Sequence, residues 1–239
     1  MKTSNKIILA LGLFIAVLIV VSLVQLRIVA DRTTAELGGT RVLEGITEGE
    51  SKSRSYPLRD FSRLRVNGGW VIDLEAGDEY RVELSYPEGV EEYLVVEKKD
   101  DVLLLGTSGI ISLRGNHLRA RIVLPRLEEL ASEGGLSFSM SGFRGEELSI
   151  RSGGGLHMKA SDSSYDDLSL KLDGGTQGDL RDLEVENLDI RANGAVALEL
   201  SIRGGRLSGE INGAAALNIY GQVGSNSLQV HGVSNIEYH

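Results

Sequence analysis

Short stretches in which apolar and polar residues alternate recur through the second half of the chain, each followed by a bend rich in glycine, asparagine or aspartate. They begin at Leu148, Leu168, Leu188, Leu207 and Leu228, at steps of 20, 20, 19 and 21 residues. Alternation with period two is typical of a half-buried strand, and glycine tolerates the backbone angles of a sharp bend. A repeat of this length indicates a solenoid, in which each unit buries its apolar side by stacking on its neighbours.

Alternation resumes after each bend, as in LHMKA at 156–160 and VALEL at 196–200. Two strands and a third side within 20 residues make one coil of a parallel β-helix, with adjacent coils about 4.8 Å apart. The handedness of parallel crossovers favours right-handed winding. The fold class is therefore all-β, a right-handed parallel β-helix. An antiparallel β-sandwich is the alternative, although a sandwich does not require the same phrase at the same period.

The first half of this domain is β-rich but less regular. The segment RLRVNGGWVIDL at 63–74 already resembles the repeat, and further strands are expected at 80–86, 94–97, 102–106 and 118–124. Asp100 and Asp101 form a hairpin turn between two of these strands. We divide the domain, residues 56–239, into less regular coils and hairpins at 56–126, which cap the N-terminal end, and regular coils at 127–239.

The N-terminal part of the chain has a different character. Residues 7–26 (IILALGLFIAVLIVVSLVQL) carry no charge, and as a helix they would span about 30 Å, the thickness of a hydrocarbon core. The run is longer than the apolar part of a cleaved signal peptide. The sequence therefore predicts a single-pass transmembrane anchor in residues 1–30 with the lipid bilayer as its partner. The alternative is secretion after signal cleavage. Residues 31–55 are a polar linker.

Composition narrows the function classes. A net charge of −9 and a pI near 5.0 argue against nucleic acid as a partner, because its phosphates call for a basic patch. The absence of cysteine excludes disulfides, thiolate metal sites, cysteine nucleophiles and a lipoprotein anchor.

These residues carry a family resemblance. The opening FSRLRVNGGWVIDLEAG, the middle segment HLRARIVLPRLEELASEGG and the serial bends SGGG, DGG, NGA and NGA resemble the head GIN domain of autotransporter adhesins, a bacterial family of unknown function. The resemblance covers about residues 56–239. It implies a parallel β-helix and a location in the cell envelope, and it implies no catalytic residues.

Parallel β-helices include polysaccharide lyases and hydrolases, whose sites use clustered carboxylates. The best candidates are two groups of acidic residues on the third side of successive coils: Asp162, Asp166 and Asp167, then Asp182, Glu184 and Glu186. No paired carboxylates persist on this side in later coils. We therefore interpret these acidic residues as solvent-exposed charges in loops. The four histidines are His117, His157, His231 and His239; His157 and His231 occupy different repeat positions. We predict no enzyme activity and no catalytic, cofactor-binding or metal-binding residue.

Two further patterns read as structural. The segment 174–179 resembles a calcium-binding nonapeptide of other β-helices but occurs once, so we expect a bend and a strand there. Asn193 and Asn212 are expected to hydrogen-bond along a ladder of stacked coils.

The outward side of the second strand presents a flat, polar face of small residues that could bind a glycan or an envelope protein. Its members are Ser137, Ser139, His157, Lys159, Gln177, Asp179, Ala197, Glu199, Ala216 and Asn218.

The last coil, residues 228–238, leaves an open strand edge, for which we expect a partner or self-association. The sequence thus predicts a membrane-anchored module of the bacterial envelope with its β-domain outside the cytoplasm, serving binding, adhesion or structure. A polysaccharide-acting enzyme, or the ectodomain of an envelope sensor with a separate output partner, are the alternatives.

Overall fold

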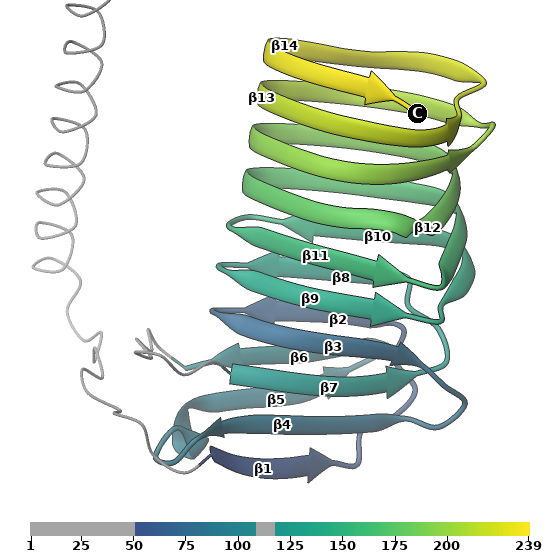
Figure 1. The fold of residues 1–239 in the computed structure, drawn as a ribbon. Coiled ribbons are helices and arrows are strands. Elements are labelled where there is room, and N and C mark those ends of the chain that lie inside the picture. The colour runs from purple at the N-terminus through teal and green to yellow at the C-terminus, as the bar shows by residue number, and fades with distance from the viewer. Residues whose placement is uncertain (1–50, 109–117) are drawn as a thin grey trace, which may run out of the picture. The chain divides into compact units, whose positions relative to one another are not determined.

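The computed structural model describes residues 51–108 and 118–239, which form one sheet wound into a solenoid (Figure 1). A single turn of 3₁₀ helix, η1 (Glu91–Tyr93), interrupts the strands. The described part holds no helix of the length and apolarity that crossing a membrane requires. The expected anchor at 7–26 and residues 31–50 of the expected linker lie outside the described residues. Residues 51–55, also expected as linker, instead belong to a strand that pairs within the sheet.

The regular half confirms the predicted β-helix. Its strands pair in parallel, with Leu148 opposite Leu168 and Leu188 opposite Leu207. The sandwich alternative is therefore wrong, while the right-handed winding stays a prediction. The strands are β8 (Glu129–Glu133), β9 (Leu136–Ser141), β10 (Arg144–Ser152), β11 (Leu156–Ser161), β12 (Ser163–Arg203), β13 (Arg206–Gln222) and β14 (Ser225–Tyr238). The 41 residues of β12 run round the coil without a break (Figure 1).

The register of the last coil differs from the sequence expectation. Leu228 lies opposite Gly209, and Asn226 lies opposite Leu207, so the final step is 19 residues rather than 21. The same register puts Gly232 opposite Gly213 at the bend. The glycines of the bends therefore stay aligned in the last coil, whereas the leucines do not.

The less regular half has a spatial order that differs from its order in the chain. Its strands are β1 (Ser51–Tyr56), β2 (Arg63–Asn67), β3 (Trp70–Ala76), β4 (Arg81–Pro87), β5 (Leu94–Lys99), β6 (Val102–Thr107) and β7 (Leu118–Leu124). β2 and β3 lie between β6 and β7 on one side and β8 and β9 on the other. β1, β4 and β5 pair antiparallel and close this end of the solenoid (Figure 1). The predicted hairpin turn is confirmed, since β5 and β6 pair across Asp100, whose φ is 55°.

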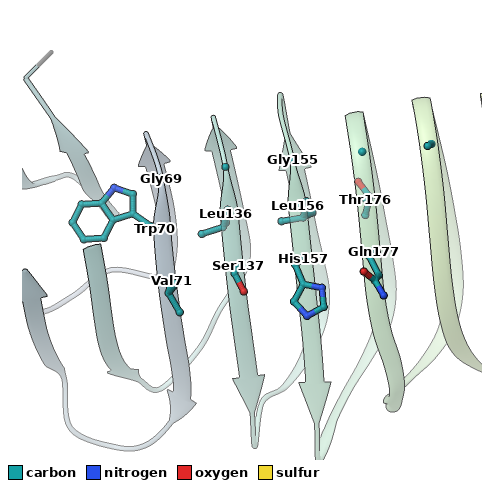
Figure 2. A pocket seen from close by; sticks show the side chains of 13 residues that line it. Gly69, Trp70, Val71, Leu136, Ser137, Gly155, Leu156, His157, Thr176 and Gln177 are labelled. Carbon is teal, nitrogen blue, oxygen red and sulfur yellow. The ribbon is translucent and has the colours of Figure 1, made fainter. Parts of the chain in front are cut away.

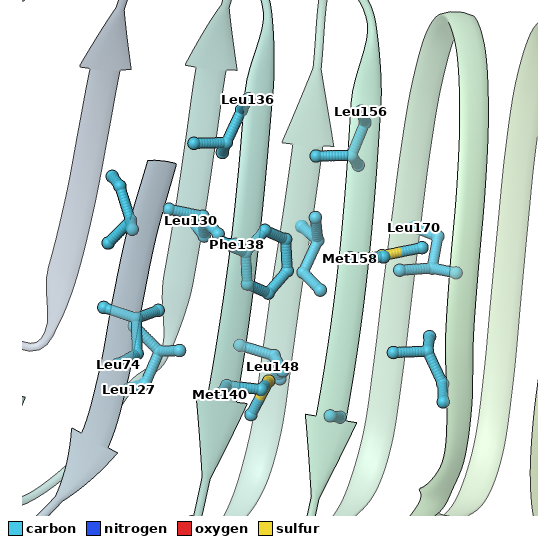
Figure 3. Close-up of a cluster of buried hydrophobic side chains, with 14 of the residues drawn as sticks. Leu74, Leu127, Leu130, Leu136, Phe138, Met140, Leu148, Leu156, Met158 and Leu170 are labelled. Carbon is cyan, nitrogen blue, oxygen red and sulfur yellow. The ribbon is translucent and has the colours of Figure 1, made fainter. Parts of the chain in front are cut away.

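The core is one column of side chains inside the coils. Leu148, Leu168, Leu188 and Leu207 are each at most 2% exposed. Figure 3 shows leucine, methionine and phenylalanine side chains from neighbouring strands meeting in this interior. Each such side chain contributes about 1.5–3 kcal/mol through burial, so the coils are held together mainly by this column.

One large polar residue fits into the column through a neighbouring glycine. Tyr165 is 1% exposed and stacks on Gly145, where an added Cβ would lie 2.7 Å from the tyrosine ring. Its hydroxyl donates a hydrogen bond to the Leu127 carbonyl oxygen at 2.9 Å. Burial, and to a lesser extent the Glu128 carboxylate, raise the pKa of Tyr165 above its ordinary range.

The bends bring successive backbones into contact. A Cβ built on Gly154 would lie 2.2 Å from the Gly134 carbonyl oxygen, and one on Gly194 would lie 2.2 Å from the Gly174 oxygen. Gly194 also has a φ of 136°, which side-chain-bearing residues rarely adopt. Stacking at the bend therefore requires glycine at this position of each coil.

Two adjacent glycines of one bend should respond differently to alanine. Gly154→Ala forces its methyl group against backbone and should lower the free energy of unfolding by about 1–3 kcal/mol. Gly155→Ala is the matched control, because its Cβ would meet nothing within 4 Å. It should leave stability unchanged or raise it by up to about 1 kcal/mol. Urea unfolding of a fragment spanning residues 51–239 measures both, and equal effects would contradict the steric argument.

Tyr165 should make the protein less stable at alkaline pH. The unfolded state releases the phenolic proton above about pH 10, whereas the folded state keeps it because the folded pKa is raised. Stability is therefore full below about pH 10 and falls by up to about 1.4 kcal/mol per pH unit as the pH rises towards the folded pKa. Tyr165→Phe should not show this fall in stability, because phenylalanine has no proton to release. The test is to measure the unfolding free energy of the parent protein and of Tyr165→Phe at about pH 9 and about pH 11. If both lose the same stability between these pH values, Tyr165 is not the cause.

Candidate functional site

A long trough follows the bend between the first and second strands of the coils. Two cavities of about 670 Å³ and about 280 Å³ lie along it and share the lining residues Thr176 and Ala195. The first is lined by Gly69, Trp70, Val71, Gly135, Leu136, Ser137, Gly155, Leu156, His157, Gly175, Thr176, Gln177 and Ala195 (Figure 2). The second continues through Val196, Ala197, Ala214, Ala215, Ala216, Val233, Ser234 and Asn235. Together they cross the coils from β3 to β14.

The trough is open because one position of the bend carries no side chain. Gly69, Gly135, Gly155 and Gly175 occupy equivalent places in successive coils, and a Cβ on any of them would meet nothing within 4 Å. None of them has a positive φ. Neither backbone conformation nor packing within the chain requires glycine there, in contrast to the neighbouring position of Gly154.

Later coils show that this position accepts larger residues. Ala195, Ala214 and Val233 follow in the same register, and all three are exposed. The bare part of the trough is therefore confined to the coils that contain β3, β9, β11 and the first bend of β12. In the coils beyond it, towards β14, the side chains of Ala195, Ala214 and Val233 fill part of this space.

One wall of the trough is the outward side of the second strand. Figure 2 shows Val71, Ser137, His157 and Gln177 side by side on successive strands, next to the glycine column. Val71 supplies methyl groups and Ser137 a hydroxyl, while His157 supplies an imidazole and Gln177 a carboxamide. The ten residues that the sequence assigned to this face are all exposed or partly exposed, which confirms the predicted alternation.

Further from the trough, ion pairs hold polar groups of the same face in place. Arg181 donates to both carboxylate oxygens of Asp179 at 2.9 Å and lies 2.9 Å from Glu199. The guanidinium holds the pKa of Asp179 below its usual range. Ser139 donates to Asp73 at 2.6 Å. These groups are fixed before any ligand arrives, which reduces the entropy cost of binding.

Thr176 is a polar residue at a position that leucine holds in the preceding coils. It occupies the inward position that Leu136 and Leu156 hold in the preceding coils, and it is 5% exposed. Its hydroxyl is buried without a hydrogen-bond partner. An unpaired buried hydroxyl costs about 1–3 kcal/mol, so this coil is weakened beneath the trough.

Two other hollows are lined by charged residues of both signs. A cavity of about 340 Å³ lies on the first-strand face, which is the outward side of β2, β8 and β10. Another cavity, of about 610 Å³, lies between that face and the third side of the coils. Arg151 and Glu129 line both and lie 3.5 Å apart, while Arg126 and Glu128 in the larger one are 2.9 Å apart. The smaller cavity is lined by three basic and three acidic residues, whereas the larger one has three arginines and four glutamates and so carries a net charge of −1.

The acidic candidates of the third side are distributed along it and are engaged in part with other groups. Asp162 pairs with Arg144 at 2.6 Å, Asp167 accepts a hydrogen bond from Asn187 at 3.0 Å, and Glu184 lies 3.8 Å from Arg203. Across residues 51–108 and 118–239, no three His, Asp or Glu side chains gather in a group that could hold a metal ion.

The histidines are separated. His157 lines the trough, His231 lies 3.7 Å from Glu210, and His239 stacks on the Tyr220 ring at a centroid distance of 4.8 Å. His117 lies outside the described residues.

The structural patterns expected from sequence are present. Asn193 donates to Asp173 at 2.8 Å and Asn212 donates to Asn193 at 3.3 Å, so the predicted ladder is confirmed and begins one coil earlier with an aspartate. Segment 174–179 is a bend followed by strand, with Thr176 opposite Leu156. The sequence analysis missed the difference between the two glycine positions of each bend, although the pairs Gly134-Gly135 and Gly154-Gly155 were its visible signal.

Comparison with solved structures finds the same fold in bacterial proteins. A "putative adhesin" from Bacteroides fragilis matches with a TM-score of 0.54 and 14% identity, over 80% of this chain and 98% of that one. A "putative adhesin" from Parabacteroides merdae matches with a TM-score of 0.51 and 18% identity, over 80% and 97%. A "putative lipid binding protein" from Parabacteroides distasonis gives 0.50 and 16%, over 80% and 97%. Identities this low show the fold alone.

No curated protein matches the chain. A family model does match, over residues 60–239, and it covers the whole β-helix except β1. The resemblance found in the bends and in the opening strand pair is thereby confirmed. The chain belongs to the family described as "Putative auto-transporter adhesin, head GIN domain".

Proposed function

We propose that the solenoid is a non-catalytic binding module of the cell envelope, and that an extended glycan chain lies in the trough across successive coils. The observation that carries the proposal is the column of Gly69, Gly135, Gly155 and Gly175, which the fold does not need. Where the native backbone angles suit alanine as well, glycine costs about 0.4–1 kcal/mol of stability relative to alanine. Four such positions in register give up stability and keep one surface open.

The chemistry of the trough suits a sugar chain. Sugar rings have apolar faces and hydroxyl edges, and the trough sets bare backbone beside the hydroxyl of Ser137, the imidazole of His157 and the carboxamide of Gln177. These groups can donate and accept hydrogen bonds. Because coils repeat about every 4.8 Å, a polymer along the axis passes one such side chain on each successive strand.

The family membership supports a place at the cell surface. In this proposal residues 7–26 anchor the chain in the membrane, residues 31–50 act as the tether, and the β-domain lies outside the cytoplasm. An adhesin-like module of this kind holds a ligand without changing it. The third-side carboxylates of Asp162, Asp167 and Glu184 interact with other side chains of the solenoid, which agrees with that role.

Filling the trough should abolish glycan binding without unfolding the protein. Gly155→Gln/Gly175→Gln places two long side chains where an added Cβ meets open space. On an array of bacterial and plant polysaccharides, we expect residues 51–239 to bind, and the double variant to bind about tenfold more weakly or worse.

Arg151→Gln/Lys171→Gln is the control, because it introduces the same side chain into the same two coils on the first-strand face. It should bind like the parent protein. Equal binding by the trough variant and the parent protein would refute the assigned site. New reducing ends in a bound polysaccharide would contradict the non-catalytic role.

A further inference from the structure

We infer that β14 is a docking edge for a second copy of this chain, so that two solenoids stack end to end with last coil against last coil. This inference is independent of glycan binding in the trough. It rests on the edge, the charge and the apolar surface of β14.

β14 has one unpaired side. All 14 of its residues pair in parallel with β13, from Arg206 opposite Ser225 to Ile219 opposite Tyr238. Among the described residues, no strand pairs with its other side. An edge of this length offers a row of backbone donors and acceptors to another strand.

The other free edges of the sheet are protected, and β14 is not. β1 and β5 each pair with one neighbour, each has six residues, and they carry Lys52 and Arg54, and Lys98 and Lys99. Lysine on short edge strands discourages pairing with other chains. The sequence of β14, SNSLQVHGVSNIEY, contains Glu237 but no other aspartate, glutamate, lysine or arginine; it has one histidine, His231, and no proline. Two copies of β14 can therefore approach without strong repulsion.

The last coil also exposes apolar surface. Across residues 51–108 and 118–239, the large hydrophobic side chains exposed to solvent are Val233 at 80% and Tyr238 at 53%, both on β14. Leu228, Val230 and Ile236 pack against the core but stay partly exposed. The equivalent side chains of β13, such as Ile211 and Leu217, are covered by β14 and are at most 1% exposed.

A second copy fits this end better than a single strand does. A lone peptide would pair with one stretch of β14 and leave the rest of the coil open. A coil of the same outline can cover the whole edge and the apolar side chains together. A twofold axis across the end would set the two β14 strands antiparallel and make the contact self-complementary.

Lysines on the edge should prevent the association. In nonionic detergent, we expect sedimentation velocity of the full 239-residue chain to show a monomer that dimerises with rising concentration. Gln229→Lys/Val233→Lys changes two exposed side chains and gives β14 the protection that β1 has. Its dimer dissociation constant should rise about tenfold or more.

Gln177→Lys/Ala197→Lys is the matched control, with the same charge change at exposed positions of β12. It should dimerise like the parent chain. A parent chain that stays monomeric at every concentration overturns the inference. An edge variant that associates as strongly as the control also overturns it, because association would then run through another part of the chain.

A cross-linking measurement keeps the test decisive if the lysine variant unfolds. The chain has no cysteine, so Val233→Cys or Ser55→Cys introduces a single thiol, on β14 or on β1. A short bis-maleimide should link Val233→Cys into dimers and leave Ser55→Cys monomeric. No dimer from Val233→Cys, or equal dimer from both, would refute docking at β14.

Discussion

The structure depends on the close approach of backbones at one bend of every coil. Gly154 lies so near the Gly134 carbonyl oxygen that a single methyl group would not fit, and the same contact recurs at Gly194 and at Gly232. This contact fixes which residues of adjacent coils face each other, and the hydrogen bonds and the leucine column follow from it. In the last coil it prevails over leucine alignment, since Gly232 meets Gly213 while Leu228 faces a glycine.

The second glycine of the bend has a different meaning. Gly155 stands beside Gly154 in the chain, yet a side chain on it would reach only open space. Later coils carry Ala195, Ala214 and Val233 at the equivalent place. Stability and surface shape thus depend on two neighbouring residues: Gly154 allows the coils to stack closely, and Gly155 shapes the trough that we associate with ligand binding.

The two ends of the solenoid solve the edge problem in different ways. At the N-terminal end, antiparallel strands cover the coils and carry lysine and arginine on their free edges. At β14 the edge is long, nearly uncharged and partly apolar. Exposed edges of this kind are a liability unless they are covered, so the difference between the ends carries functional information.

The sequence by itself determined the coil, its length, the inward leucines and the asparagine ladder, because a period of about 20 residues brings equivalent positions of successive coils over one another. The hairpin at Asp100 was also readable from local turn chemistry. Only the tertiary structure decided that β6 and β7 pack beneath β2 and β3, out of chain order. It also decided the register of Leu228 and the distinction between Gly154 and Gly155. These depend on how closely atoms from distant segments approach, and that distance is not encoded in any local pattern.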